Sequence, residues 1–210
     1  MTPTATDLLL VIDVQNDFCP GGALAVADGD AVAPIINGLA RRFANVVMTQ
    51  DWHPAGHSSF ASTHPGAAPF SSITMPYGEQ TLWPDHCIQG TKGAEFHPAL
   101  DLPMAQMVIR KGFRQAIDSY SAFFENDRRT ATGLAGYMRE RGLTRIFAVG
   151  LATDYCVRYS VEDARRLGFE AVLVTDACRA IDLGGSLAAG LQAMREAGAG
   201  FVESAAIHGG

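Results

Sequence analysis

Short runs of consecutive apolar residues, separated by helical patterns, restrict the fold of this chain most. Leu8–Ile12 is one such run, and others lie at 45–49, 107–110, 145–149, 171–174 and 200–202. Uninterrupted runs of this length are typical of parallel strands buried on both faces. Helical spacing of apolar residues occupies 31–43, 130–141, 154–167 and 187–194. This alternation predicts a three-layer α/β/α fold with a Rossmann-like, mainly parallel six-stranded sheet.

Composition excludes several classes of protein. The chain has 210 residues, of which 48% are hydrophobic and 18% charged, so we expect residues 1–210 to form a single domain with a sizeable core. A net charge of -6 repels phosphate backbones and argues against a nucleic-acid partner. No run approaches the roughly 18 apolar residues that cross a bilayer.

The cellular setting is an expectation of the same kind. The polar N-terminus, residues 1–7, lacks the basic segment of a secretion signal, and the four cysteines include no C-x-x-C pair. We therefore expect a cytoplasmic protein without a membrane partner, with reduced thiols. A homo-oligomer remains possible on this evidence.

Residues 51–106 break the alternation of strands and helices. The segment shows no convincing long helix or strand, and it holds seven of the ten prolines, both tryptophans and five of the six histidines. A loop this long inside a compact domain is usually functional or disordered, and the tryptophans and histidines argue against disorder. We expect a metal-binding and substrate-binding loop insertion.

Reactive side chains follow four of the predicted strands. Asp13 ends the first strand, Asp51 and then His53 end the second, Lys111 ends the third, and Cys156 follows the fourth. In open parallel sheets, ligands bind beyond the carboxyl ends of the strands. A carboxylate, a metal-like pair, a lysine and a thiol are therefore predicted to converge on one edge of the sheet.

Cys156 is predicted to lie in the first turn of a helix that Thr153 or Asp154 caps. In that position the helix dipole lowers the pKa of a thiol, and free N–H groups can bind an oxyanion. Asp13 could take the thiol proton, and Lys111 could stabilise both anions. The alternative for Cys156 alone is a buried structural cysteine, but the three residues together favour a nucleophile.

Asp51 and His53 are two positions apart in an extended strand, so their side chains point to the same side. His86 could complete a set of two imidazoles and one carboxylate, which leaves open positions on a metal ion. Spacing alone gives equal weight to loop histidines that bond to the backbone. His57 could be a fourth ligand or could support the other three.

Six motifs together resemble the nicotinamidase/pyrazinamidase family, within the isochorismatase-like cysteine hydrolases. The motifs are Asp13–Phe18, Asp51–His57, Trp83–Cys87, Arg110–Gly112, Asp118–Phe123 and Gly150–Val157. The resemblance extends over almost the whole chain, and related hydrolases that share the triad generally lack the metal motifs.

The resemblance implies a role for each matching residue. It implies a catalytic triad of Asp13, Lys111 and Cys156, and one divalent metal ion bound by Asp51, His53 and His86. Zinc is the first expectation for that ion, and iron or manganese would also suit these ligands. The Leu151–Ala152 peptide is expected to be cis, with the N–H groups of Ala152 and Cys156 directed at an oxyanion. Phe18 and Trp83 are expected to sandwich the substrate ring, and Tyr120 is a further candidate.

The activity implied by the resemblance is hydrolysis of nicotinamide, and also of pyrazinamide, to the acid and ammonia in NAD salvage. The reaction would pass through a thioester on Cys156. An alternative is another amidohydrolase of the superfamily, acting on a carbamoyl or ureido substrate. A vinyl ether hydrolase is disfavoured because its reaction would not use the Cys156 thiol. The intact triad argues against an inert partner-binding or metal-storage protein.

Overall fold

The computed structural model describes residues 1–209 and contains a six-stranded parallel sheet. The strands are β1 (Asp7–Ile12), β2 (Asn45–Asp51), β5 (Met107–Lys111), β6 (Arg145–Leu151), β7 (Glu170–Arg179) and β8 (Gly200–Val202). Their order in the sheet is β5-β2-β1-β6-β7-β8, and every neighbouring pair is parallel. The predicted Rossmann-like arrangement is confirmed.

The strand order reverses direction between β1 and β6. The chain moves outward from β1 to β2 and β5, and then returns to the other side of β1 to form β6, β7 and β8. A switch point of this kind opens a crevice beyond the carboxyl ends of the two central strands. Asp13 follows β1 there, and Cys156 follows β6.

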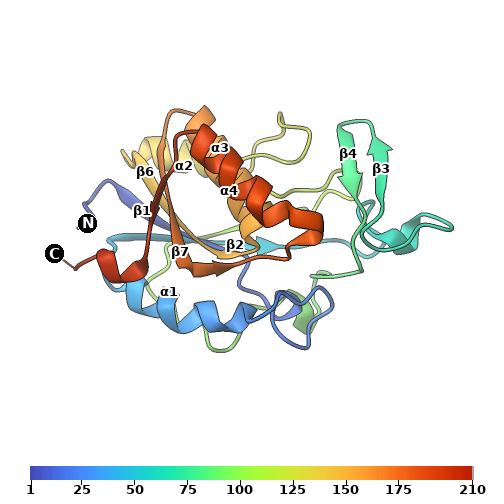
Figure 1. The fold of residues 1–210 in the computed structure, drawn as a ribbon, viewed down its shortest axis with the longest axis horizontal. Helices are drawn as coiled ribbons and strands as arrows, with labels where there is room; N and C mark the ends of the chain where they lie inside the picture. The colour runs from blue at the N-terminus through green and yellow to red at the C-terminus, as the bar shows by residue number, and fades with distance from the viewer. Residues whose placement is uncertain (210) are drawn as a thin grey trace.

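Helices cover both faces of the sheet (Figure 1). Helix α1 (Val32–Ala40) packs on one face, and α2 (Leu134–Glu140), α3 (Arg158–Arg166) and α4 (Ser186–Glu196) cover the other. Within residues 1–209, no helix is both long and apolar enough to cross a membrane.

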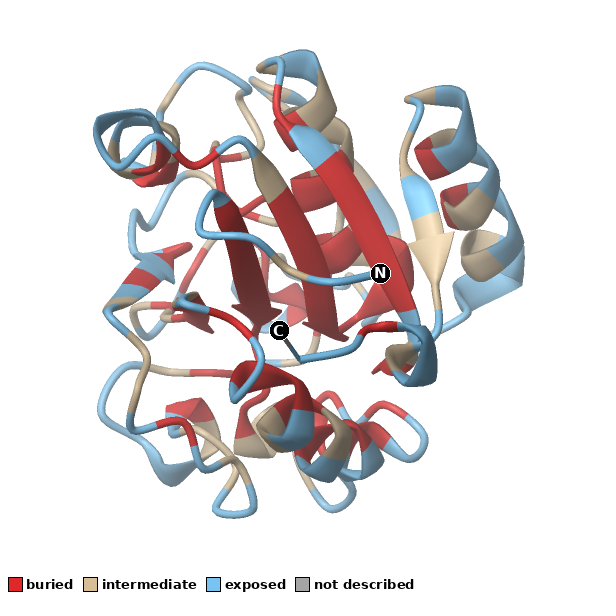
Figure 2. Ribbon diagram, turned by 90° about the vertical axis from the view of Figure 1, so that its left-hand side faces the viewer, coloured by how far each residue is buried: buried red, intermediate tan, exposed pale blue. Residues whose placement is uncertain are grey.

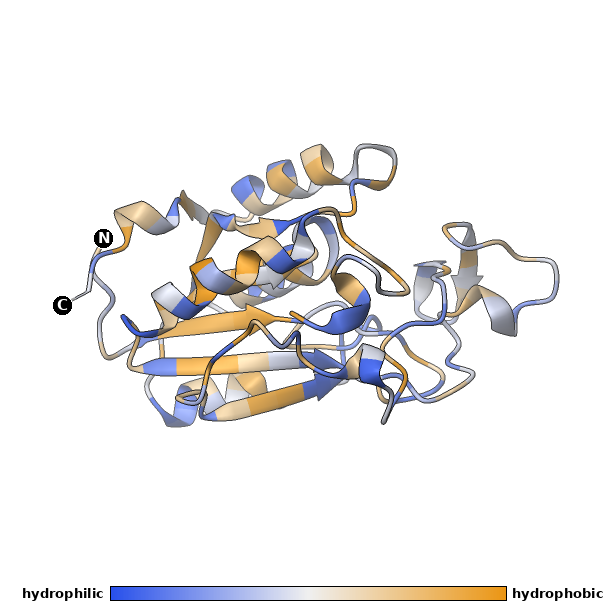
Figure 3. Ribbon diagram, turned by 90° about the horizontal axis from the view of Figure 1, so that it is seen from below, coloured by the Kyte–Doolittle hydropathy of each residue, from blue (hydrophilic) through white to orange (hydrophobic). Residues whose placement is uncertain are grey.

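The central strand β1 shows why this chain forms a layered fold. Leu9 and Val11 enter the core beneath α1, whereas Leu8, Leu10 and Ile12 enter the core beneath α2, α3 and α4. All five are at most 1% exposed, and burying each such side chain contributes about 1.5–3 kcal/mol. Figure 2 shows the central strands buried along their length. In Figure 3 the strands are hydrophobic along most of their length, and β2, which ends at Asp51, and β5, which ends at Lys111, turn hydrophilic at their tips, where the site lies.

Two of the helices are shorter than their sequence patterns predicted. The pattern over 31–43 gives a helix over Val32–Ala40, and the pattern over 130–141 gives Leu134–Glu140. The predicted helix at 154–167 begins instead as a π-helical turn, Thr153–Val157, and continues as α3.

The predicted cap of that helix is wrong. Ala152 occupies the N-cap position, and no side chain caps the turn. The carboxylate of Asp154 accepts hydrogen bonds from the backbone N–H groups of Ile181 and Asp182 and from the hydroxyl of Ser186. These three donors take the place of the helix N–H groups that Asp154 was predicted to cap. Asp154 therefore connects the turn to the start of α4 and the loop before it.

The segment 51–106 is more regular than predicted. It contains an antiparallel hairpin of β3 (Ser72–Met75) and β4 (Gly78–Thr81), paired from Ser72↔Thr81 to Met75↔Gly78. The segment thus has no long strand, as predicted, but the hairpin gives it two strands of four residues each. Most hairpin residues are partly or fully exposed, so no apolar alternation marks the strands. Isolated bridges also pair His53 with Ile88 and Phe60 with Trp83.

Candidate active site

Asp13, Lys111 and Cys156 lie together beyond the carboxyl ends of β1, β5 and β6. The Nζ atom of Lys111 is 2.8 Å from Asp13 Oδ2 and 3.4 Å from Cys156 Sγ. Asp13 and Lys111 are fully buried, and Cys156 is 7% exposed. Three separate strand ends therefore bring an acid, a cation and a thiol into direct contact.

A threonine in β2 holds the Asp13 carboxylate in place. Thr49 Oγ1 donates a hydrogen bond of 2.6 Å to Asp13 Oδ1 and accepts one of 3.2 Å from the Asp13 backbone N–H. Asp13 has a φ of 49°, an unusual value for a residue other than glycine, and these two bonds stabilise that conformation. Sequence reasoning missed Thr49, because a threonine inside an apolar run is simply a good strand former.

Burial governs the protonation of this group. It raises the pKa of the Cys156 thiol well above its usual range, although the Lys111 charge opposes the shift. It also raises the pKa of Asp13, again against the effect of Lys111. The thiol therefore carries its proton at neutral pH before a substrate binds. The prediction that the helix start lowers the pKa of Cys156 is wrong, because loss of solvent raises this pKa more than the helix dipole and the Lys111 charge lower it.

Lys111 also contacts Asp51, its register partner across β2 and β5. Its Nζ atom is 3.0 Å from Asp51 Oδ1 and donates to the backbone carbonyl of Ser119 at 2.9 Å. Burial alone would lower the pKa of Lys111, but Asp13 and Asp51 outweigh it and hold that pKa well above its usual range. Lys111 is therefore a permanent cation between two carboxylates.

The predicted metal-ligand residues form one buried cluster. Asp51 Oδ2 lies 2.9 Å from His53 Nε2 and 3.3 Å from His86 Nε2, and one donor atom from each residue lies within 4.8 Å of the others. Burial would raise the pKa of Asp51, but His53 and Lys111 hold it well below its usual range, so the carboxylate is ionised.

The second ring nitrogens show that the cluster fits a metal ion. His53 Nδ1 is 2.9 Å from the Gly112 carbonyl, and His86 Nδ1 is 2.8 Å from the Pro84 carbonyl. A carbonyl only accepts, so each Nδ1 carries a proton, and Nε2 is the nitrogen that each ring turns toward Asp51 and the cluster. Backbone partners of this kind orient histidine ligands in metalloproteins. The sequence left two interpretations of these histidines, backbone-bonded loop residues or metal ligands. The structure shows that the same rings bond to the backbone through Nδ1 and face the cluster through Nε2.

Gly112 is required for this arrangement. Its φ is 65°, and a Cβ atom there would lie 2.5 Å from His53 Cε1. A side chain would displace the imidazole from the carbonyl that orients it, so a glycine must follow Lys111.

His57 lies beside the cluster with both nitrogens already bonded. Its Nδ1 accepts a hydrogen bond of 3.2 Å from the Ser59 N–H, and its Nε2 donates to the carbonyls of Arg114 and Ile117 at 3.0 and 3.2 Å. Its ring packs 4.3 Å from that of His53. This geometry favours a supporting role for His57 over direct ligation, because no lone pair faces the cluster.

A cavity with aromatic walls lies above Cys156. Its lining comprises Phe18, Leu24, Asp51, Trp83, His86, Asp118, Tyr120, Ala152, Tyr155, Cys156 and Ile181. The three predicted substrate-binding aromatics all belong to it. Sequence reasoning missed Tyr155, whose ring packs edge-on to Trp83 at 4.8 Å, and the buried Asp118. The position of Tyr155 beside Cys156 was the available signal. Apolar walls with polar groups at one end suit a planar polar ring.

The chain turns sharply between β6 and the cavity. The peptide bond between Leu151 and Ala152 is cis, as the resemblance implied. Gly150 has a φ of 114°, and a Cβ atom there would lie 2.1 Å from the Ile12 carbonyl oxygen. The absence of a side chain at Gly150 therefore lets β6 approach β1 closely at the switch point.

Comparison with known proteins agrees with this geometry. The isochorismatase domain model matches residues 7–206. The curated nicotinamidase of Acinetobacter baylyi is 55% identical over 196 residues, which cover 93% of this chain and 92% of that protein. The chain belongs to the nicotinamidase/pyrazinamidase family.

Solved structures of this family superpose closely on the chain. The nicotinamidase/pyrazinamidase of Acinetobacter baumanii has a TM-score of 0.95 at 54% identity, covering 96% of this chain and 98% of that one. PnC1 from L. infantum, in complex with nicotinate, has a TM-score of 0.87 at 39% identity, covering 100% and 99%. The pyrazinamidase of Pyrococcus horikoshii, in complex with zinc, has a TM-score of 0.77 at 35% identity, covering 94% and 99%.

Proposed function

We propose that this protein is a nicotinamidase that hydrolyses nicotinamide to nicotinate and ammonia, and that it also accepts pyrazinamide. The observation that carries the proposal is the contact of Lys111 with both Asp13 and Cys156 at the base of an aromatic-walled cavity. The nicotinate bound to the L. infantum relative supports the substrate class. We propose that the whole chain, residues 1–210, acts as one hydrolase domain in NAD salvage.

The triad supplies acylation in this proposal. Asp13 takes the thiol proton as Cys156 Sγ attacks the carboxamide carbon, and the N–H groups of Ala152 and Cys156 stabilise the oxyanion. Lys111 stabilises the negative charge as it moves from carboxylate to sulfur. Asp13 then returns the proton to the leaving nitrogen, the C–N bond breaks, and ammonia departs from a nicotinoyl thioester.

Hydrolysis of the thioester reverses the roles. Asp13 takes a proton from water as the water oxygen attacks the thioester carbon. The C–S bond breaks, nicotinic acid forms, and the thiolate recovers its proton from Asp13. The acid then gives its carboxyl proton to the released ammonia and leaves as nicotinate. One water is consumed, and no net charge accumulates on the triad.

Asp51, His53 and His86 would hold the metal ion. Two imidazoles and one carboxylate suit zinc, iron or manganese, and the zinc-bound P. horikoshii relative makes zinc the first choice. When bound, the ion would supply a Lewis acid that binds the pyridine nitrogen and orders water at the polar end of the cavity. Phe18 and Trp83, with Tyr120, would hold the substrate ring against that end.

Ammonia release from nicotinamide tests the proposal directly. We expect Cys156→Ala to abolish turnover, whereas Cys178→Ala, a matched buried cysteine in the core below α3, should retain most of it. Full activity in Cys156→Ala would show that the thioester mechanism is wrong. Activity on a carbamoyl or ureido amide but not on nicotinamide would favour the other amidohydrolase chemistry.

A further inference from the structure

The loop after β1 contains Asp17, a residue of the first family motif to which the proposed function gives no role. Its Oδ2 accepts a hydrogen bond of 2.7 Å from the backbone N–H of Cys87, and its Oδ1 accepts one of 3.2 Å from the backbone N–H of Ala23. The Cys87 N–H belongs to the peptide bond that follows His86. Asp17 therefore holds the backbone directly beside a predicted metal ligand that is distant from it in the sequence.

Cys87 joins the two histidines of the cluster through its backbone. It is fully buried and has a φ of 45°, an unusual value for a residue other than glycine. Its carbonyl accepts a hydrogen bond of 3.0 Å from the backbone N–H of His53, and the His53 carbonyl accepts one of 2.8 Å from the N–H of Gln89. The bond from Asp17 stabilises the conformation of Cys87, and so holds His86 and His53 in one arrangement.

The same loop also holds the third predicted ligand. Gln15 is fully buried, and its side-chain amide donates to the Asp51 carbonyl at 2.8 Å and accepts from the Asp51 N–H at 2.7 Å. Gln15 and Asp17 thus bond to the backbone at two separate segments that carry the metal-ligand residues. This arrangement orients the ligands through their main chain as well as through their rings.

Gly93 leaves space for the Asp17 carboxylate. A Cβ atom at Gly93 would lie 2.1 Å from Asp17 Oδ2 and 2.5 Å from Asp17 Oδ1. The three nearest atoms all belong to the end of this one side chain, so a methyl group at Gly93 would displace the carboxylate. A substitution at Gly93 therefore moves Asp17 without altering it chemically.

We propose that Asp17 is a positioning residue for the metal ion, and that its bond to the Cys87 N–H fixes the backbone that directs His86 into the cluster. The inference rests on the metal site of the proposed function. Residues that orient metal ligands account for roughly 10- to 100-fold in metal affinity. Asp17 acts on His86 through one peptide bond, so we expect the lower end of that range.

Zinc affinity, measured in competition with a chromophoric chelator, tests the proposal independently of turnover. Asp17→Ala should weaken zinc binding about 10-fold. Gly93→Ala should weaken it to a similar extent in the wild-type background but change it little in Asp17→Ala, because the added methyl group then displaces no carboxylate. Asp17→Asn keeps an oxygen for the Cys87 N–H and should retain most of the affinity.

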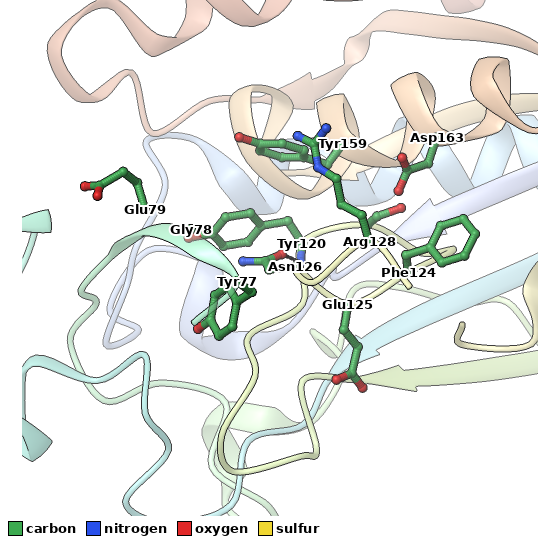
Figure 4. A pocket seen from close by; sticks show the side chains of 11 residues that line it. Tyr77, Gly78, Glu79, Tyr120, Phe124, Glu125, Asn126, Arg128, Tyr159 and Asp163 are labelled. Carbon is green, nitrogen blue, oxygen red and sulfur yellow. Dashed lines mark hydrogen bonds between the residues drawn. The ribbon is translucent and has the colours of Figure 1, made fainter. Parts of the chain in front are cut away.

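Two controls distinguish this role from general stabilisation. Asp176→Ala removes another half-buried carboxylate that binds a backbone N–H at 2.7 Å, that of Ser204. Asn126 lies beside Tyr120 in the cavity that adjoins the substrate site (Figure 4), and its side chain bonds to the Tyr120 N–H and to Gln80. Within residues 1–209 neither side chain bonds to a neighbour of a metal ligand, so Asp176→Ala and Asn126→Ala should leave the zinc affinity unchanged.

Three results would overturn the proposal. The first is wild-type zinc affinity in Asp17→Ala, and the second is an equal loss from Gly93→Ala in both backgrounds. The third is an equal loss from Asp17→Asn and Asp17→Ala, because the effect would then come from the charge rather than from the bond to Cys87. If Asp17→Ala does not fold, Asp17→Ser takes its place in the same cycle.

Ammonia release separates this proposal from the proposed function. If wild-type protein releases no ammonia from nicotinamide but the zinc cycle is non-additive, the proposed activity is wrong and the role of Asp17 stands. If wild-type protein is active but Asp17→Ala binds zinc as tightly as wild type, the activity stands and the role of Asp17 is wrong. His86→Ala is the reference variant and should lose zinc binding. Wild-type zinc affinity in His86→Ala would place the ion elsewhere and overturn the role of Asp17 together with the metal site.

Discussion

Asp51 and Lys111 are direct neighbours across β2 and β5, and their ion pair of 3.0 Å joins the triad to the metal-ligand cluster. One carboxylate oxygen of Asp51 faces Lys111, and the other faces His53 and His86. Sequence spacing describes these as two separate groups. The structure shows one continuous charge network, so a change at either end alters the electrostatics of the other.

Lys111→Met should lower kcat by about 10²-fold or more, on the scale of losing a preorganised electrostatic group. The substitution keeps much of the stem but leaves two buried carboxylates without their cation. Because the Lys111 charge opposes the rise in the pKa of Cys156, this thiol should react with iodoacetamide more slowly in Lys111→Met than in wild type. Arg110→Met is the control, since Arg110 is exposed and stacks on Trp52. A near-normal kcat in Lys111→Met would contradict the assigned role.

Thr49→Val should move the acid limb of the pH–activity profile to higher pH. Burial raises the pKa of Asp13 above its ordinary value of 3.8, and the bond from Thr49 partly opposes this. Asp13 must be ionised to act as a base, so kcat/KM falls as the pH drops through the raised pKa. Removing the opposing bond raises that pKa further. Thr175→Val, at an exposed position in β7, should not shift the limb. An unchanged limb in Thr49→Val would exclude Asp13 as the titrating base.

Metal removal by a chelator should loosen the segment between β2 and β5. Asp51 and His53 at the end of β2, together with His86, would close a loop of more than thirty residues through the ion. We expect limited proteolysis to cut faster between residues 54 and 103, while circular dichroism shows an intact sheet. Readdition of zinc should restore resistance. Equal cleavage with and without metal would mean that the hairpin and backbone bridges alone order the segment.

Benzamide should be a much poorer substrate than nicotinamide for the metal-loaded protein. The two molecules share the ring shape and the carboxamide, but benzamide has no ring nitrogen for the ion. In metal-stripped protein the difference should shrink, because both would depend on Phe18, Trp83 and the oxyanion donors. The ratio of the two kcat/KM values, measured with and without metal, checks this. Equal turnover of both substrates by loaded protein would assign the metal a structural role only.

Asp7→Asn should destabilise the fold without changing kcat. Asp7 is 1% exposed, and Arg145 bonds both of its oxygens at 2.8 and 2.7 Å. Losing this bidentate pair at the amino edge of the sheet should cost about 1–3 kcal/mol in urea unfolding at pH 7. Arg166→Gln, which removes an exposed guanidinium from its pair with Asp163, should cost much less.

The stability difference between wild type and Asp7→Asn should depend on pH in a definite direction. Burial alone would raise the pKa of Asp7, but the Arg145 bonds lower it below its ordinary value of 3.8. A lowered folded-state pKa stabilises the protein above pH 3.8 and loses this contribution as the pH falls through the folded value. The difference between wild type and Asp7→Asn should therefore be full at pH 7 and shrink below pH 3.8. A difference that grew in acid would contradict the assignment.

The sequence predicted the sheet and the convergence of Asp13, Lys111 and Cys156 because both follow from one rule. Buried parallel strands are marked by apolar runs, and their carboxyl ends meet at one edge. Local sequence patterns were therefore sufficient to predict that residues nearly 150 positions apart meet in one site.

Residues that act by holding others were not predictable in this way. Thr49 fits a buried strand on its own, and only the fold shows that it bonds Asp13. Gln80 lies in a hairpin without apolar alternation, and three of its hydrogen-bond partners are 38 to 46 positions away. The Asp154 cap failed for a related reason, since distant donors replaced a local one. Long-range hydrogen bonds produce no periodic pattern of residues in a sequence, so pattern analysis does not reveal them.

The β3–β4 hairpin has a consequence for how this scaffold can change. Within residues 1–209 its two strands pair only with each other, outside the six-stranded sheet. Yet Gln80 of β4 reaches the cavity wall, while Asp13, Lys111 and Cys156 come from the sheet. The hairpin therefore contacts the cavity wall from outside the sheet that carries the triad. Exchanging or resizing it would reshape one part of that wall while Asp13, Lys111 and Cys156 keep their positions in the sheet, which gives evolution, or an engineer, a place to alter the choice of amide.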